Sequence, residues 1–221
     1  MGLYGVVLAA GESTRMGRDK ALLPWPPYGA KVSKVEQNPI LKLQPVQAPF
    51  SGTLLSSSIE AFSAVCDLVI VVAGENESRL RPLVDSAGAF LLRNPKPELG
   101  QFSSLQVGLR EVLNRGRDTA MITLVDRPPP RPETLVNLVG AFEGRERSTW
   151  AVIPEFDAKH GHPILIGREM IEIFLRAPAT ANAREIEHEY ESRIAYLPVD
   201  DARVTLNLNT PEDYAKISHI S

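Results

Sequence analysis

The residues with the clearest chemical potential stand near the start of the chain, where the apolar run YGVVLA leads into a loop of small and basic residues. Gly11, Ser13 and Thr14 let a ligand approach the backbone closely, and free N–H groups in such a turn form an anion-binding concavity. Arg15 and Lys20 add two cations within six positions, a combination that suits a triphosphate. From spacing alone, a surface turn with a solvated basic pair explains the loop equally well.

Two further residues could hold a cation. Asp126 directly follows the apolar run AMITLV, and Asn209 stands in LNLNTPEDY near the end of the chain. Magnesium takes few protein ligands and fills its shell with water and phosphate oxygens, so one or two protein oxygens are enough. On the residues alone, Asp126 is more readily explained as a turn residue before prolines. Asn209 can equally belong to the start of a last helix, with Pro211 in its first turn.

The elements that must position these residues are predicted by the apolar pattern. Short, continuous apolar runs predict strands buried on both faces, at 4–9, 68–73, 89–93, 120–125, 150–156, 162–167 and 193–199. Apolar residues at helical spacing predict helices between them, at 54–65, 77–88, 103–116 and 132–144. Alternating strands and helices indicate an α/β fold with a mostly parallel sheet. Gly11 and Asp126 both follow strand ends, so they can share one crevice at the carboxyl edge of the sheet.

Composition sets the broad class of the protein. The chain has 221 residues, 43% of them apolar, with a net charge of -3 and a mean hydropathy of -0.10. We therefore expect one domain over 1–221, with no nucleic-acid or membrane surface. The single cysteine, Cys66, excludes an internal disulfide framework. No signal peptide or apolar run of transmembrane length is present, so we expect a cytoplasmic enzyme.

A Pro-rich stretch at about 26–50 interrupts the α/β pattern. It reads as an insertion in a loop beside the site, and a loop of this length is usually a lid, an oligomer contact or disordered.

The ordered string LAAGESTRMGRDKALLP resembles the signature loop of the MobA-like nucleotidyltransferases, and most closely that of the MocA-like group of molybdenum cofactor cytidylyltransferases. The segments NPKPELGQFSSLQVGL, GHPILIG and NTPEDY resemble further elements of that family. The resemblance implies a single-domain, three-layer α/β/α fold with a twisted, Rossmann-like sheet, of the nucleotide-diphospho-sugar transferase type. It covers nearly the whole chain apart from the insertion.

The resemblance also implies roles for individual residues. The implied nucleotide-binding residues are Leu8, Ala9, Ala10, Gly11, Ser13, Thr14, Arg15, Lys20, Asn94, Gly100 and Ser104. The implied catalytic residues are Arg15, Lys20 and Asp126, with Asp126 and Asn209 as ligands of Mg²⁺ and with His162 and Pro163 facing the acceptor. The chain departs from the family pattern at Val125, where Gly is common, at Arg127, where Gln or Met is common, and at Asn207 and Asn209, where Asp is usual.

The function implied is transfer of a nucleoside monophosphate, with CMP from CTP favoured, to a phosphorylated small-molecule acceptor of the molybdopterin type. Transfer to a small sugar or polyol phosphate, such as 2-C-methyl-D-erythritol 4-phosphate, is an alternative within the class. The departures at Val125, Asn207 and Asn209 also allow a nucleotide-binding or chaperone-like module with weakened turnover. A homo-oligomer or a molybdoenzyme partner is compatible with the sequence.

Overall fold

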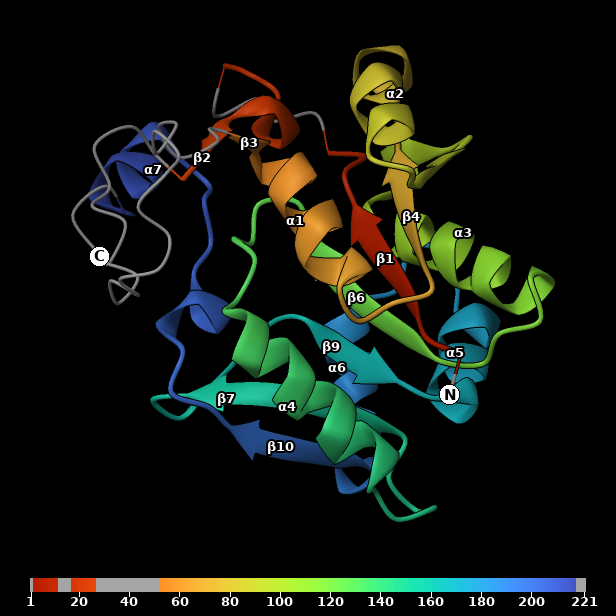
Figure 1. Ribbon diagram of the computed structural model, residues 1–221. Coiled ribbons are helices and arrows are strands. Elements are labelled where there is room, and N and C mark those ends of the chain that lie inside the picture. Colours follow the sequence, from red (N-terminus) through yellow and green to blue (C-terminus); the bar gives the residue numbers. More distant parts are fainter. Residues whose placement is uncertain (1, 12–16, 27–51, 218–221) are drawn as a thin grey trace.

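A computed structural model describes residues 2–11, 17–26 and 52–217 (Figure 1). The Pro-rich insertion predicted at 26–50 therefore lies outside the described residues, apart from Pro26. All seven predicted strands and all four predicted helices are present, with bounds within about two residues of those expected, as is usual for element ends.

The core of the fold is an eight-stranded sheet with the order β10-β7-β9-β6-β1-β4-β5, in which β8 pairs only with β7. Its strands are β1 (Tyr4–Leu8), β4 (Leu68–Ala73), β5 (Phe90–Arg93), β6 (Ala120–Leu124), β7 (Ala151–Phe156), β8 (Lys159–His160), β9 (Ile164–Ile166) and β10 (Ile194–Pro198).

The sheet is mostly parallel, as predicted. β5, β4, β1 and β6 run parallel to one another, and β10 runs parallel to β7. β9 is antiparallel to both β6 and β7, and β8 is antiparallel to β7. The short connection from β7 to β9 explains this departure, because a parallel neighbour requires a crossover of a dozen or more residues.

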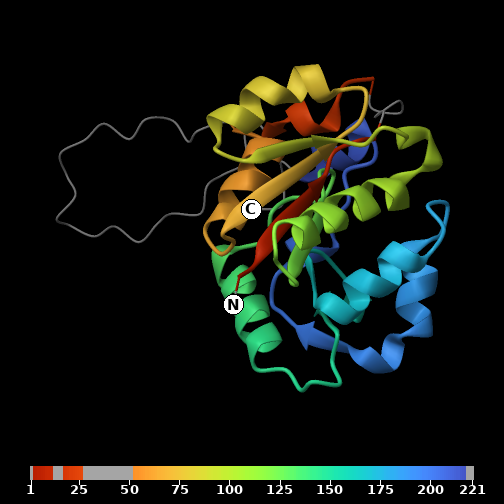
Figure 2. The same ribbon diagram turned by 90° about the vertical axis from the view of Figure 1, so that its right-hand side faces the viewer.

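Helices cover both faces of the sheet and give the predicted three layers (Figure 2). One face carries α1 (Leu54–Ser63), α2 (Glu77–Ser86) and α4 (Pro132–Glu143), and the other carries α3 (Gln101–Asn114), α5 (Arg168–Arg176) and α6 (Ala183–Glu189).

The central strand β1 shows why the sheet needs cover on both sides. Val7 and Ala9 belong to the apolar cluster on the α1 side, whereas Val6 and Leu8 belong to the cluster on the α3 side. Val6 and Val7 are fully buried, and burial of such a side chain contributes roughly 1.5–3 kcal/mol. A continuous apolar run is therefore the pattern that a two-sided parallel strand requires.

The carboxyl ends of β1, β4 and β6 lie at one edge of the sheet. Leu8 pairs with Val72 on one side and with Leu124 on the other, so the residues that follow these three strands emerge together. These segments are 9–11, 74–76 and 125–127, and each supplies two residues to the lining of the site described below.

A second, two-stranded sheet closes this edge. It pairs β2 (Pro24–Trp25) with β3 (Gly52–Thr53), and Trp25 packs with Leu54 and Leu208 in a small apolar cluster. The Tyr214 hydroxyl of α7 (Pro211–Ile217) donates to the carbonyl of Pro24. The end of the chain is thereby held against the segment that carries Lys20. In the described parts of the chain, no helix is both long and apolar enough to cross a membrane.

Candidate functional site

Three residues that are far apart in the chain meet at the carboxyl edge of the sheet. Lys20 begins the short helix η2 (Lys20–Leu22), Asp126 follows β6, and Asn209 precedes α7. The ammonium of Lys20 donates to Asp126 Oδ2 at 3.1 Å and to Asn209 Oδ1 at 3.0 Å. The Lys20 and Asp126 side chains are only 14% and 21% exposed, so their charges act through less water than a surface pair.

The second oxygen of Asp126 is poised for another partner. Oδ1 is buried and has no hydrogen-bond partner within the described part of the chain. A buried carboxylate oxygen is costly to leave unsatisfied, so a donor or a cation is expected there. Asp126 therefore lies in the turn before the prolines and also contacts Lys20 with one oxygen, which leaves the other oxygen for a further partner.

Asn209 stands directly before the cap of α7, and its side chain reaches into the site. Thr210 starts α7, since its Oγ1 accepts from the Asp213 N–H while its own N–H donates to Asp213 Oδ2. The side chain of Asn209 takes no part in this cap and reaches Lys20 instead. The segment therefore begins a helix and also delivers an amide oxygen to the site.

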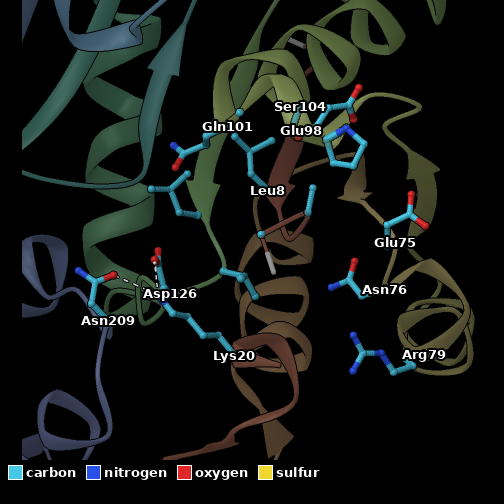
Figure 3. Close-up of a pocket in the computed structure, with 16 residues that line it drawn as sticks. Leu8, Lys20, Glu75, Asn76, Arg79, Glu98, Gln101, Ser104, Asp126 and Asn209 are labelled. Carbon is cyan, nitrogen blue, oxygen red and sulfur yellow. Dashed lines mark hydrogen bonds and ion pairs between the residues drawn. The ribbon is translucent and has the colours of Figure 1, made fainter. Parts of the chain in front are cut away.

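A cavity of about 810 Å³ opens beside these residues (Figure 3). It is lined by Leu8, Ala10, Gly11, Lys20, Glu75, Asn76, Arg79, Pro97, Glu98, Gly100, Gln101, Ser104, Leu124, Val125, Asp126 and Asn209. Figure 3 shows Lys20, Asp126 and Asn209 at one end and Glu98, Gln101 and Ser104 at the other. The cavity thus has an ammonium and a carboxylate at one end, and a carboxylate, an amide and a hydroxyl at the other.

The predicted nucleotide loop contributes its first residues to this cavity. Leu8, Ala10 and Gly11 line it, and Ala9 is buried just behind them. Ser13, Thr14 and Arg15 lie outside the described residues, so their roles stay predictions. Gly74 passes so close to the loop that a Cβ there would meet the Ala10 carbonyl at 2.8 Å, which explains why the smallest residue is needed.

Sequence reasoning missed the residues that brace this loop. The buried Asn76 donates from Nδ2 to the Ala9 carbonyl at 2.9 Å and to Asp19 Oδ2 at 2.9 Å, and its Oδ1 accepts from the Gly74 N–H at 3.0 Å. The other oxygen of Asp19 caps η2 by accepting from the Ala21 N–H. One amide therefore joins the residue before the loop to the residue just before Lys20.

The signal that could have revealed Asn76 is its place just after β4. Ligands of open α/β sheets bind outside the carboxyl ends of the strands, and the sequence assigns those ends well. Asp19 carried no comparable signal, because its two partners are fixed only by the tertiary structure.

In the segment 94–104, which is predicted to lie near the base, some residues line the cavity and others support them from behind. Gly100 and Ser104 line the cavity, with Gly100 at a φ of 98° that favours glycine. Asn94 does not line it, being 1% exposed. Its Nδ2 donates to the hydroxyls of Ser103 and Ser104 at 2.8 and 2.9 Å. Asn94 therefore holds Ser104 in place from behind the wall.

His162 and Pro163, predicted to face the acceptor, lie outside the lining of this cavity, next to Arg127. Burial lowers the pKa of His162 to about 4, helped by the positive charges of Arg127 and Arg184, while the backbone of Ile122 opposes the shift. Burial also lowers the pKa of Arg127, whereas the Asp126 carboxylate raises it. His162 is consequently neutral at pH 7.

Comparison with known proteins decides the family. The model of the family described as "MobA-like NTP transferase domain" matches residues 5–194 of the chain. The chain belongs to this family. A probable molybdenum cofactor guanylyltransferase of Rhodopirellula baltica is 28% identical to this MobA-like chain over 96% of it and 89% of the relative. The molybdenum cofactor cytidylyltransferase of Escherichia coli is 24% identical over 95% and 92% of the two chains.

Solved structures agree on the fold of this MobA-like chain. A crystal structure from Mycobacterium tuberculosis H37Rv has a TM-score of 0.76 at 24% identity and covers 99% of this chain and 98% of that one. A nucleotidyl transferase from Methanothermobacter thermautotroptrophicus has a TM-score of 0.73 at 20% identity, with 99% and 97% covered. The predicted family and fold are therefore confirmed, and the protein is a nucleotidyltransferase.

The brace around the loop can be tested by its contribution to stability. In Asn76→Ala, the Gly74 N–H, the Ala9 carbonyl and one Asp19 oxygen lose their partner, so we expect the free energy of unfolding to fall by at least about 2 kcal/mol. Chemical denaturation measures this loss. Asn137→Ala, on the exposed face of α4, is the matched control and should change stability by less than about 0.5 kcal/mol. Equal effects of the two substitutions would contradict the brace.

The buried imidazole predicts a pH dependence of stability. His162 resists protonation down to about pH 4 in the folded chain, whereas the unfolded chain takes up the proton near 6.5. The unfolded state therefore binds more protons in this window, and stability falls as the pH is lowered through it. The unfolding free energies of wild type and His162→Gln should diverge there with a slope approaching roughly 1.4 kcal/mol per pH unit. Parallel curves from chemical denaturation would show that His162 is not shielded as described.

Proposed function

We propose that this nucleotidyltransferase moves a nucleoside monophosphate, with CMP from CTP favoured, onto a phosphorylated acceptor of the molybdopterin type and releases pyrophosphate. The observation that carries the proposal is the meeting of Lys20, Asp126 and Asn209 beside Gly11 at one end of a cavity. An ammonium and two cation-binding oxygens next to a loop of small residues suit the triphosphate of a nucleotide. Relatives named as molybdenum cofactor guanylyl- and cytidylyltransferases support the acceptor class.

The proposed chemistry needs little covalent help from the protein. An oxygen of the acceptor phosphate forms a bond to the α-phosphorus, the bond from the α-phosphorus to the bridging oxygen breaks, and pyrophosphate leaves with the electron pair. A phosphomonoester is already ionised near neutral pH, so no general base is required. Positioning and charge neutralisation dominate such reactions. Lys20 supplies a positive charge, and the backbone of Ala10 and Gly11 lies where the phosphates must run.

The residues present fit a magnesium ion. Asp126 Oδ2 and Asn209 Oδ1 converge on one cation, the Lys20 ammonium, and Asp126 Oδ1 is buried without a partner among the described residues. Asp126 and Asn209 would hold the ion, and when bound it would offset the charge of the phosphates. Asn209 offers a neutral oxygen where an Asp would offer a charge, so we expect weaker metal binding than with two carboxylates.

The identity of the nucleotide base is a separate part of the proposal. CTP is favoured by the LAAG opening of the loop, which resembles the cytidylyltransferase branch. GTP is the second candidate, because the Rhodopirellula baltica relative is named a guanylyltransferase. The cavity end formed by Gly100, Gln101 and Ser104 is where we expect the base and sugar to lie.

The two alternatives have weaker support. A solved 4-diphosphocytidyl-2C-methyl-D-erythritol synthase from Anaerococcus prevotii shares the fold with a TM-score of 0.65, but only 13% of its sequence. A binding module without turnover would not need Lys20 and Asp126 together, and both are in place.

Calorimetric titration of CTP, GTP, ATP and UTP with magnesium tests the proposal on wild type and on Asp126→Ala. Selective binding of CTP that weakens in the variant supports it, and selective binding of GTP moves the reaction to GMP transfer. If none of the four nucleotides binds, the proposed function fails.

Turnover tests the roles of the charged groups. Removing one preorganised electrostatic group typically costs roughly a hundred- to thousandfold in rate, so Lys20→Ala and Asp126→Ala should each lose at least that much. Pyrophosphate release in steady state measures the loss. Arg110→Ala, exposed on α3, removes a cation away from the cavity and should retain wild-type turnover. Near-normal turnover in either site variant would remove the role assigned to that residue.

Because Asn209 is a neutral ligand in the proposed site, a charged residue at this position should bind magnesium more tightly. Asn209→Asp adds a charge beside Asp126, so the magnesium concentration that gives half-maximal turnover should fall, by about tenfold for roughly 1.4 kcal/mol of added interaction. Asn209→Ala removes the oxygen and should raise that concentration. Equal magnesium requirements in all three proteins would exclude Asn209 as a ligand.

A further inference from the structure

Arg79 lies in the first turn of α2 and lines the nucleotide cavity. It belongs to none of the segments that carry the family resemblance. The helix is held in place by Leu80 and Val84, which are fully buried in the apolar cluster on this face of the sheet. Because Arg79 stands next to Leu80, its backbone position is fixed, while its side chain is 63% exposed.

The side chain of Arg79 faces Lys20 across the cavity. Figure 3 shows the two residues on opposite sides of the same end, with the guanidinium of Arg79 directed toward the Lys20 side. Among the described residues that line the cavity, these two carry the only positive charges. An anion that lay along the backbone of Gly11 would therefore meet one cation from each wall.

The acids near Arg79 on this side of the cavity are paired with other arginines. Glu75, which also lines the cavity, accepts from Arg93 Nη2 at 2.9 Å. Glu77 accepts from Arg81, one turn further along α2. Each of these acids thus has its own cation, and the charge of Arg79 is left for another partner.

The carboxylate of Asp19 holds Arg79 only loosely. Arg79 Nη2 lies 3.5 Å from Asp19 Oδ2, a distance too long for a good hydrogen bond. The two oxygens of Asp19 already accept from Asn76 Nδ2 and from the Ala21 N–H. Within the described parts of the chain, the guanidinium makes no other ion pair and no hydrogen bond. A planar fork with unused donors matches the oxygens of a phosphate.

The proposed reaction needs a cation in addition to Lys20. A triphosphate carries several negative charges, and Lys20 is already paired with the Asp126 carboxylate at 3.1 Å. When the bond from the α-phosphorus to the bridging oxygen breaks, that oxygen keeps the electron pair, so the pyrophosphate gains negative charge. A fixed cation that faces the departing phosphates stabilises this charge as it develops.

We propose that Arg79 binds the nucleotide phosphates beyond the α-phosphate and holds the pyrophosphate as it leaves. This proposal rests on the proposed function, and it extends the phosphate site from the loop after β1 to the first turn of α2. Before the nucleotide binds, Asp19 keeps the guanidinium at the cavity wall. The phosphates carry more charge than this carboxylate and have unoccupied acceptors, so they take the donors of Arg79 when they bind. Arg79 thereby favours triphosphates over monophosphates.

Calorimetric titration of pyrophosphate, CTP and CMP at constant magnesium tests this role on the full chain. Arg79→Gln should weaken the binding of pyrophosphate and CTP about fivefold, the upper range for an ion pair with an exposed side chain. It should leave CMP binding unchanged, because CMP lacks the phosphates that Arg79 contacts. Arg79→Lys keeps the charge without the planar fork and should recover part of the loss. If GTP is the nucleotide that binds, GTP and GMP replace CTP and CMP.

Two further variants separate phosphate binding from support of the fold. Arg81→Gln lies on the same helix, changes the net charge equally and does not line the cavity, so it should leave all three titrations unchanged. Asn76→Ala disturbs the brace that includes Asp19, so it should weaken CMP and CTP alike. If Arg79 acted only by holding Asp19, Arg79→Gln would resemble Asn76→Ala and would also weaken CMP.

The proposal is overturned if Arg79→Gln binds pyrophosphate and CTP as wild type does, if it weakens CMP as much as CTP, or if Arg81→Gln shows the same losses. Selective nucleotide binding by wild type, with an affinity that does not depend on Arg79, refutes the role of Arg79 alone. If no nucleotide binds to wild type, the proposed function fails, and the role of Arg79 fails with it.

Discussion

The site depends on one partly buried ammonium, that of Lys20. Lys20 Nζ bonds to Asp126, 106 positions away, and to Asn209, 189 positions away, and so joins the start, the middle and the end of the chain. These bonds bring a carboxylate and a neutral amide oxygen together. They also pair the charge of Lys20 with that of Asp126, since an unpaired charge in a partly buried place would be costly. Three elements of the fold position these residues. Asp126 follows β6, Lys20 begins η2, and the side chain of Asn209 is available because Thr210 and Asp213 cap α7.

Polar contacts hold the described residues on either side of the loop next to this ammonium, Ala9 and Asp19. The sheet beneath is a two-sided apolar core that fixes where each strand ends. Beyond those ends the backbone leaves the sheet, and its donors and acceptors need new partners. Asn76 and Asp19 provide them, and the same carboxylate that accepts from Asn76 also caps the turn that begins at Lys20. The described residues that flank the loop, Ala9 and Asp19, are thereby joined to each other through Asn76.

The strand order divides the molecule into two halves that meet at β6. The parallel half around β1 and β4 places the cavity with Lys20, whereas the half around β7, β8 and β9 places η5 (Ala202–Thr205), Arg127 and His162. Asp126 follows β6, between the two halves. At this boundary Asp126 lies beside Lys20 in the lining of the cavity.

The sequence by itself determined the layered α/β architecture. Continuous apolar runs and helical spacing show which side chains are buried, and this local pattern decides the order of strands and helices and hence the fold class. It also predicted Lys20, Asp126 and Asn209 as one site, since the motif string resembles a family and since carboxyl ends of parallel strands meet at one edge. Only the tertiary structure decided that β8 and β9 run antiparallel, that Asn94 supports the wall instead of lining it, and that Asn76 and Asp19 brace the loop. Those outcomes depend on hydrogen bonds between residues distant in the chain, and residue type and local spacing carry no record of such partners.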